Sequence, residues 1–437
     1  MFINRKKVWS LSWPLIIANF TIPLVGLTDT IIMGHMPDSL YLAAIAIGGI
    51  VFNFMYAGLN FLRMGTTGIV AQKFGENNFE EVFFSLLRPT LIAVSVGFIL
   101  YLNRNYIYDL SVYFLTPDQQ LLALYKEYLF IRMIGLPAGL LNIVFLGWFF
   151  GMQKTKSVML QLVIINLTNV FASLYLAVYL EYGIFGVAVG SVLAQISGLF
   201  LSIIIFFNHF KTLNFISFEL KKIINLNGFL NLFSISKNLF VRTMLLVSVQ
   251  AYLIKKSGLI GVDQLATMEI LIVIFGLSSY TLDAFAHAAE STVGVSIGSK
   301  NKKNIYKSIK NTTEFALTFS VLIGIVLYIT DYYIINLFTD IPVLQNLTID
   351  LWSLVIITPF ISMLAFQLDG IFIGATLAKE MRNSMILSSL IFYLVIEFII
   401  QDTLNLKNLY SCFLSFLILR GVFLTFYLPR VFKLIKN

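Results

Sequence analysis

The number of long apolar stretches constrains this sequence more than any other feature. A bilayer core of about 30 Å is crossed by about 20 apolar residues of α-helix. Twelve windows of that kind, bounded by polar turns, lie at residues 8–33, 40–70, 84–102, 121–150, 157–179, 183–207, 235–256, 264–297, 311–330, 347–376, 384–400 and 408–430. Only 12% of the residues are charged and 58% are hydrophobic, which excludes a water-soluble globule and a disordered chain. The sequence predicts an all-α membrane protein with twelve transmembrane helices.

The distribution of Lys and Arg predicts the orientation, because basic residues gather in the loops that stay in the cytoplasm. With the N-terminus placed inside, the inner segments carry twenty Lys and Arg residues, and the outer loops carry only Arg104, Lys255, Lys256 and Lys407. We therefore expect a multi-pass protein of the cell membrane with both termini in the cytoplasm. The first stretch is too long for a signal-peptide core, so we expect a retained span.

The chain contains an internal repeat. A shift of 223 residues aligns two separate regions, placing Leu42, Ala43, Gly147 and Gly151 on Leu265, Ala266, Gly370 and Gly374. Because each half holds six spans, both halves enter the membrane from the same side, and the repeat is parallel. We predict an N-terminal six-helix lobe (1–207), a cytoplasmic inter-lobe linker (208–236) and a C-terminal six-helix lobe (237–437). In transporters, repeats of this kind favour a substrate path between the lobes and alternating access.

Four stretches carry a resemblance to a known family. The segment from Trp13 to Thr30 resembles the first helix of the multidrug and toxic compound extrusion (MATE) family. FLRMGTTG at Phe61–Gly68, LDAFAHAAESTVG at Leu282–Gly294 and FQLDGIFIGATLAKEMRNSM at Phe366–Met385 are similar to the second, eighth and tenth helices of its DinF branch. The resemblance covers all twelve spans in order. It implies an antiporter that exports amphiphilic, often cationic organic compounds in exchange for a coupling cation.

Asp29 is the first candidate for the site that binds the coupling cation. It lies 22 positions after Lys7, which is about 33 Å along a helix. A carboxylate in the outer half of a bilayer is costly and persists only if neighbours satisfy it or its charge is used. From the residues alone, a structural acid bonded to Asn169 or Ser191 is an equal alternative. The resemblance implies the functional role.

The resemblance implies further polar residues at the same site. Asn166 and Asn169 match the family's polar pair in the fifth helix, and Ser191 takes a position that usually holds Thr or Ser. Ser173 stands where many relatives carry a second aspartate. Loss of that carboxylate removes a charge that would help to hold sodium, so we favour a proton and keep sodium as the alternative.

The first span contains Pro14, Pro23 and Gly26. Proline removes a backbone hydrogen bond and clashes with the preceding turn, so we expect this helix to kink. The resemblance implies a bend that responds to protonation of Asp29.

A second polar group is expected in the C-terminal lobe. Asp283, His287 and Glu290 are spaced i, i+4 and i+7, on one face of the eighth helix. Asp369 lies in the tenth helix. These residues could form a proton relay, a contact for a cationic compound, or a polar network that stabilises the lobe. We expect Arg63 and Arg242 to hold helices together by pairing with acids rather than to contact a cationic substrate.

Other classes of protein are less consistent with the sequence. A flippase for lipid-linked sugars would need a strongly cationic cavity, a receptor or channel would not couple transport to ions, and no motif of a membrane enzyme is present. Without a Walker motif, an ion gradient must drive transport. One cysteine, Cys412, and three histidines predict no disulfide, metal site or cofactor. We expect a monomer in the lipid bilayer with no nucleic-acid partner.

Overall fold

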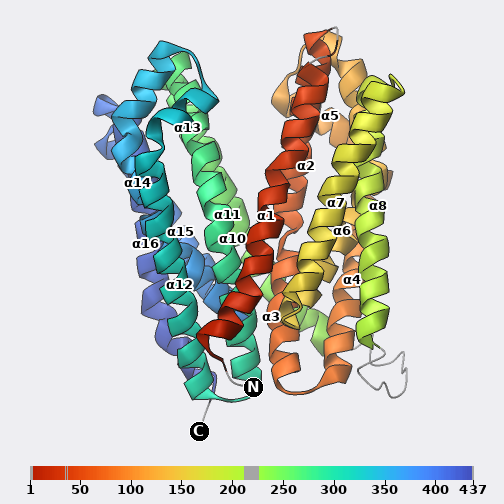
Figure 1. Ribbon diagram of the computed structural model, residues 1–437, viewed down its shortest axis with the longest axis vertical. Coiled ribbons are helices and arrows are strands. Elements are labelled where there is room, and N and C mark those ends of the chain that lie inside the picture. The colour runs from red at the N-terminus through yellow and green to blue at the C-terminus, as the bar shows by residue number, and fades with distance from the viewer. Residues whose placement is uncertain (1–2, 35, 37, 211–225, 436–437) are drawn as a thin grey trace. The chain divides into compact units, whose positions relative to one another are not determined.

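The computed structural model describes residues 3–34, 36, 38–210 and 226–435, and in this part of the chain the secondary structure is helical with no strand (Figure 1). Twelve helical segments of these residues are long and apolar enough to cross a membrane. The prediction of an all-α protein with twelve spans is therefore confirmed.

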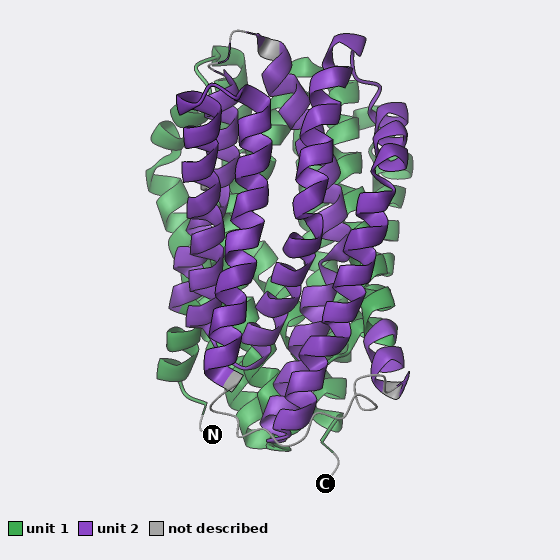
Figure 2. Ribbon diagram, turned by 90° about the vertical axis from the view of Figure 1, so that its right-hand side faces the viewer, with its two compact units in different colours: residues 1–12, 234–437 green, residues 13–233 purple. Residues whose placement is uncertain are grey.

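The chain divides into two compact units, coloured separately in Figure 2. One unit comprises residues 13–233, and the other comprises residues 1–12 and 234–437. The boundaries fall inside α1 (Arg5–Gly34) and α10 (Leu226–Ile260). The first residues group with the C-terminal half because Ile3, Val8 and Leu11 pack against Ala288. Part of the predicted linker, residues 211–225, lies outside the described residues.

In the unit of residues 13–233, most helices follow the predicted spans. They are α1 from Trp13 onward, α2 (Ser39–Leu59), α3 (Phe61–Gly75), α4 (Phe79–Leu102), α5 (Arg104–Leu115), η1 (Gln119–Leu121), α6 (Leu122–Gly151), α7 (Thr155–Ser173), η2 (Leu174–Tyr179) and α8 (Gly183–Phe210). The second predicted span is divided at Asn60, whose backbone N–H donates to the Ala57 carbonyl and closes a tighter turn. The turn η2, which directly follows Ser173, is π-helical, and such turns occur often at functional sites.

The unit of residues 1–12 and 234–437 has a matching series of helices. They are α10 from Ser234 onward, α11 (Val262–Gly298), α12 (Lys302–Ile329), α13 (Asp331–Phe338), α14 (Pro342–Gly374), α15 (Ala378–Leu394), η4 (Val395–Ile399), η5 (Gln401–Thr403) and α16 (Leu406–Lys433). A hydrophobic core cluster of this unit includes Trp352, Tyr410, Phe413 and Phe416.

The 223-residue repeat is visible in the packing of each unit. A Cβ added at Gly147 would collide with the backbone carbonyl oxygen of Arg63, and one added at Gly370 would collide with that of Ala286. The 223-residue shift relates the two glycines to each other, and it also relates the two residues that they contact. Small residues at such positions let helices approach closely in a membrane, so the same crossing of two helices occurs in both units.

The repeat extends to the turns. Asn77 and Lys300 both have a positive φ, at 56° and 53°, and so do Gln153 and Thr376, at 60° and 57°. Each pair is separated by the same 223 residues. A left-handed conformation is uncommon outside glycine, so its recurrence at two equivalent turns supports a parallel repeat of one structural unit.

Candidate functional site

Asp29 lies in α1 and is buried, with a relative exposure of 7%. Its Oδ1 atom is buried and has no hydrogen-bond partner in the described residues. Ser173, at the end of α7, lies within interaction range of the carboxylate, although the buried Ser173 Oγ meets no partner in hydrogen-bond geometry. The structure therefore brings these two predicted site residues together from α1 and α7.

The remaining residues predicted in this unit lie on α7 and α8. Asn169 donates from Nδ2 to Ser191 Oγ at 3.0 Å, and its own Oδ1 is buried with no hydrogen-bond partner among the residues that the structure describes. Asn166 donates from Nδ2 to Thr21 Oγ1 of α1 at 2.5 Å. Asn169 and Ser191 thus bond to each other. The interactions described for Asp29 are with Arg132 and Ser173, and they do not include the bond to Asn169 or Ser191 that was expected of a structural acid.

Arg132 of α6 was not among the predicted site residues, yet its guanidinium interacts electrostatically with the Asp29 carboxylate. Arg132 Nη1 donates to the Tyr128 hydroxyl at 2.7 Å, and the guanidinium lies 4.3 Å from the centre of the Phe52 ring. Tyr56 also interacts with this guanidinium. A basic residue inside a predicted span is a functional signal in its own right and could have identified Arg132.

The arrangement around Asp29 can hold a proton or a small cation. Among the described residues, Asp29, Asn169 and Ser173 each have a buried oxygen without a hydrogen-bond partner, and the fixed positive charge of Arg132 interacts with the Asp29 carboxylate. The Arg132 guanidinium stabilises the ionised carboxylate and opposes the binding of a second positive charge beside it. Protonation of Asp29 would remove the attraction that the carboxylate has for Arg132.

In the other unit, Asp369 of α14 accepts hydrogen bonds from Arg242 of α10 and from Arg420 of α16. All three side chains are buried, and the prediction that Arg242 pairs with an acid is confirmed. Asp283 is partly buried and interacts electrostatically with Arg242. Two guanidinium groups and two carboxylates therefore form one network that joins α10, α11, α14 and α16.

His287 and Glu290 form a pair on α11. His287 Nδ1 lies 3.0 Å from Glu290 Oε2, and Glu290 is completely buried. Of the residues that the sequence places on one helix face, Asp283 interacts with Arg242, and His287 contacts Glu290.

The residues predicted to bend α1 lie within one continuous helix, which contains both Pro14 and Pro23. A Cβ added at Gly26 would meet no atom within 4 Å, so close packing does not require glycine there. The bend in response to protonation stays a prediction.

Two repeated helical units, each with charged groups buried among membrane-crossing helices, define the class of protein. Buried ionisable residues in such helices mark ion and substrate pathways, and repeated six-helix units are the architecture of secondary transporters. The fold and the site thus define a multi-pass transporter of the membrane.

The chain belongs to the MatE family, whose profile matches residues 14–175 and again residues 239–401. DNA damage-inducible protein F of Escherichia coli strain K12 is 30% identical over 419 residues, which cover 96% of this chain and 91% of that protein. The probable multidrug resistance protein NorM of Thermotoga maritima is 25% identical over 77% of this chain and 73% of its own.

A solved structure agrees in fold. The crystal structure of the Vibrio cholerae MATE transporter VcmN in the bent form superposes with a TM-score of 0.86 at 15% identity, over 98% of this chain and 97% of that one. The resemblance to the MATE family and its DinF branch is confirmed. Members of this family move small organic compounds with ion coupling and are not enzymes.

Proposed function

We propose that the protein is a proton-coupled antiporter that exports amphiphilic, often cationic organic compounds across the cell membrane by alternating access. The observation that carries this proposal is the environment of Asp29, a buried carboxylate with one oxygen unpartnered and one guanidinium nearby. The name of the Thermotoga maritima relative, a probable multidrug resistance protein, supports drug-like substrates. The excess of basic residues in the inner segments supports a cytoplasmic location for both termini.

Proton binding requires only one oxygen of Asp29, and the unpartnered Oδ1 supplies it. In the ionised state the carboxylate attracts Arg132 and any cationic substrate. In the protonated state that attraction is lost, and the cationic substrate can leave. The proton and the cationic substrate are exchanged because both bind to the same negative charge, that of Asp29.

Sodium is the second candidate, favoured by two oxygens of α7 without hydrogen-bond partners among the described residues. One belongs to Ser173, which interacts with the Asp29 carboxylate, and the other belongs to Asn169, one turn earlier in α7. Sodium is a hard cation that needs several oxygen ligands at once, as calcium and magnesium do. Ser173 contributes a neutral hydroxyl, and Arg132 adds a positive charge near the site. Both features weaken a sodium site, whereas a proton forms a covalent bond with a single oxygen.

The network of Arg242, Asp369 and Arg420 is proposed to stabilise its unit rather than to bind the coupling ion. Asp369 already accepts hydrogen bonds from two buried cations, so an additional cation would have to displace a guanidinium. For His287 and Glu290, a structural pair is the simplest role, because Glu290 is completely buried and in contact with its own helix neighbour.

The test uses the full chain in proteoliposomes, with substrate-driven proton movement measured in sodium and in sodium-free potassium buffer. We expect equal proton movement in both, and loss of proton movement in Asp29→Asn. The matched control is Asp109→Asn, at an exposed acid of α5 outside the membrane-crossing helices. Export that stops when sodium is removed at a fixed proton gradient would replace the proton by sodium in this proposal.

A further inference from the structure

A polar pocket of about 370 Å³ lies within the unit of residues 13–233, and Asp29 is not among its lining residues. It is formed by α3, α4 and the first turns of α10. The lining residues are Ile69, Lys73, Glu81, Ser85, Arg88, Pro89, Gly228, Asn231 and Leu232. Neither the coupling site nor the packing of the repeat accounts for a pocket with two basic residues.

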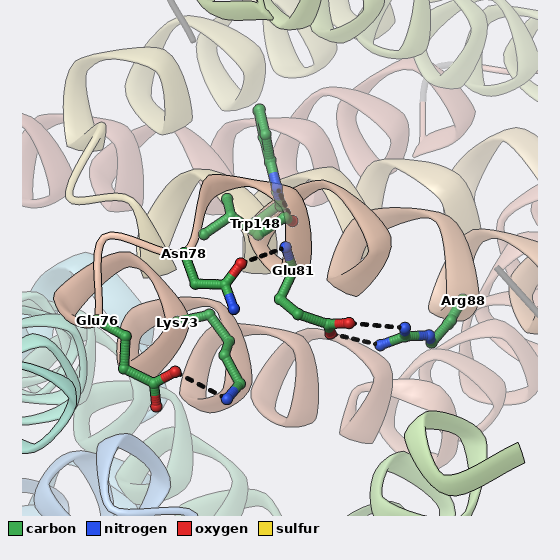
Figure 3. Close-up of polar contacts among 7 residues, drawn as sticks. Lys73, Glu76, Asn78, Glu81, Arg88 and Trp148 are labelled. Carbon is green, nitrogen blue, oxygen red and sulfur yellow. Dashed lines mark hydrogen bonds and ion pairs between the residues drawn. The ribbon is translucent and has the colours of Figure 1, made fainter. Parts of the chain in front are cut away.

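One face of α4 supplies the polar side of the pocket, because Glu81, Ser85 and Arg88 are spaced i, i+4 and i+7. Arg88 donates from Nη1 and Nη2 to the two carboxylate oxygens of Glu81, at 2.9 and 3.2 Å (Figure 3). The bidentate pair fixes the plane of the guanidinium. A Cβ added at Gly228 would lie 2.7 Å from this guanidinium, so the start of α10 packs directly on it.

Ser85 provides an unused hydrogen-bonding group in this pocket. Its side chain has a relative exposure of 5%, and its Oγ is buried with no hydrogen-bond partner in the described residues. A buried polar atom without a partner is costly and calls for a ligand or water. Ser85 therefore marks where a hydrogen-bond acceptor would lie, next to Arg88 on the same face of α4.

Lys73 supplies the positive charge at the mouth of the pocket. Its ammonium contacts Glu76 at 2.9 Å in a pair whose side chains are 34% and 37% exposed (Figure 3). Exposed pairs of this kind contribute little to stability, so a stronger anion can replace Glu76. Among the lining residues, Lys73 and Arg88 against Glu81 leave one net positive charge.

The pocket lies at the ends of membrane-crossing segments, where lipid headgroups meet the hydrocarbon of a bilayer. Lys73 lies in the last turn of α3 and Glu81 in the first turn of α4, where two membrane-crossing segments end. Ser85 and Arg88 lie one and two turns further along α4, and Ile69, Pro89 and Leu232 add apolar surface. Basic pockets between transmembrane helices on the cytoplasmic side bind anionic headgroups.

We propose that this pocket binds the phosphate group of a phosphodiester or phosphate ester, with Ser85 and Lys73 as the donors and Arg88 as a fixed cation. The single negative charge of a phosphodiester balances the net charge of the lining. The adjoining apolar residues accommodate the glycerol and the first carbons of a phospholipid, which makes a lipid headgroup the expected source.

The test measures binding to the delipidated full chain in detergent by native mass spectrometry. The probes are dioleoyl phosphatidylglycerol, dioleoylglycerol without a phosphate, and glycerol 3-phosphate. We expect phosphatidylglycerol to bind, and Ser85→Ala and Lys73→Gln each to weaken it about tenfold, as expected for loss of one hydrogen bond to a charged group. Ser85→Ala should fold normally because the hydroxyl makes no hydrogen bond with the described residues.

The control is Lys156→Gln, at an exposed lysine in the first turn of α7, which should bind phosphatidylglycerol as the unchanged protein does. Equal binding of dioleoylglycerol, or binding of phosphatidylglycerol that neither pocket variant weakens, would overturn the proposal. Glycerol 3-phosphate that binds as tightly as the lipid would keep the phosphate site and assign its source to a free ester. Because the assay measures no transport, its result is independent of the proposed coupling mechanism.

Discussion

Replacing Asp369 by asparagine should separate a structural acid from a coupling acid. Asp369 is buried and accepts hydrogen bonds from both Arg242 and Arg420, so the nearly isosteric change leaves two buried guanidinium groups without their shared carboxylate. Removing one partner of a buried ion pair costs about 3–5 kcal/mol. For a unit of this size the loss corresponds to a decrease of about 6–20 °C in the unfolding midpoint.

The same change at Asp29 should behave differently. Asp29 Oδ1 has no hydrogen-bond partner among the described residues, and Arg132 keeps its hydrogen bond to the Tyr128 hydroxyl. We therefore expect Asp29→Asn to lower the free energy of unfolding by less than Asp369→Asn does. This variant should nevertheless lose substrate-driven proton movement. Asp369→Asn should thus be identified by its loss of stability, and Asp29→Asn by its loss of proton movement.

The assay is thermal unfolding of the purified chain in one detergent, followed by intrinsic fluorescence at a fixed scan rate. A double variant, Asp369→Asn with Arg420→Met, removes one of the two stranded charges and should be less destabilised than the sum of its single changes, by about 0.5–3 kcal/mol. An unfolding midpoint of Asp369→Asn equal to that of the unchanged protein would refute the structural role. A decrease in Asp29→Asn as large as in Asp369→Asn would make Asp29 structural as well.

Three further outcomes are expected. Gly147→Ala and Gly370→Ala should each destabilise the protein by about 1–3 kcal/mol in the same unfolding assay, because both added methyl groups meet a backbone carbonyl; unequal effects would show that the two crossings are not equivalent. Gly26→Ala meets no atom and should leave stability unchanged or higher, while reduced export by this stable variant would support a bend in α1. Ser173→Asp places a second carboxylate beside Asp29 and should raise the unfolding midpoint in sodium chloride relative to potassium chloride. The unchanged protein should show no such difference between the two salts. Equal midpoints of the variant in both salts would exclude a sodium site formed by these two carboxylates.

The sequence by itself determined the features that depend on neighbours along the chain. Span number follows from local apolar length, and all twelve predicted spans correspond to helices. The repeat was readable because a shift of 223 residues places Leu42, Ala43, Gly147 and Gly151 on identical residues. Asp29 was identifiable because an acid within an apolar window is unusual whatever surrounds it.

Only the tertiary structure decided which charged groups meet. Arg132 and Asp29 come from α6 and α1, Asp369 meets arginines of α10 and α16, and the pocket that contains Ser85 joins α3, α4 and α10. A soluble helix marks its buried face with an apolar stripe, but a membrane-crossing helix is apolar on most sides, so its sequence does not show which face turns inward. Close packing of small residues and pairing of buried charges select that face, and both require the other helices to be in place.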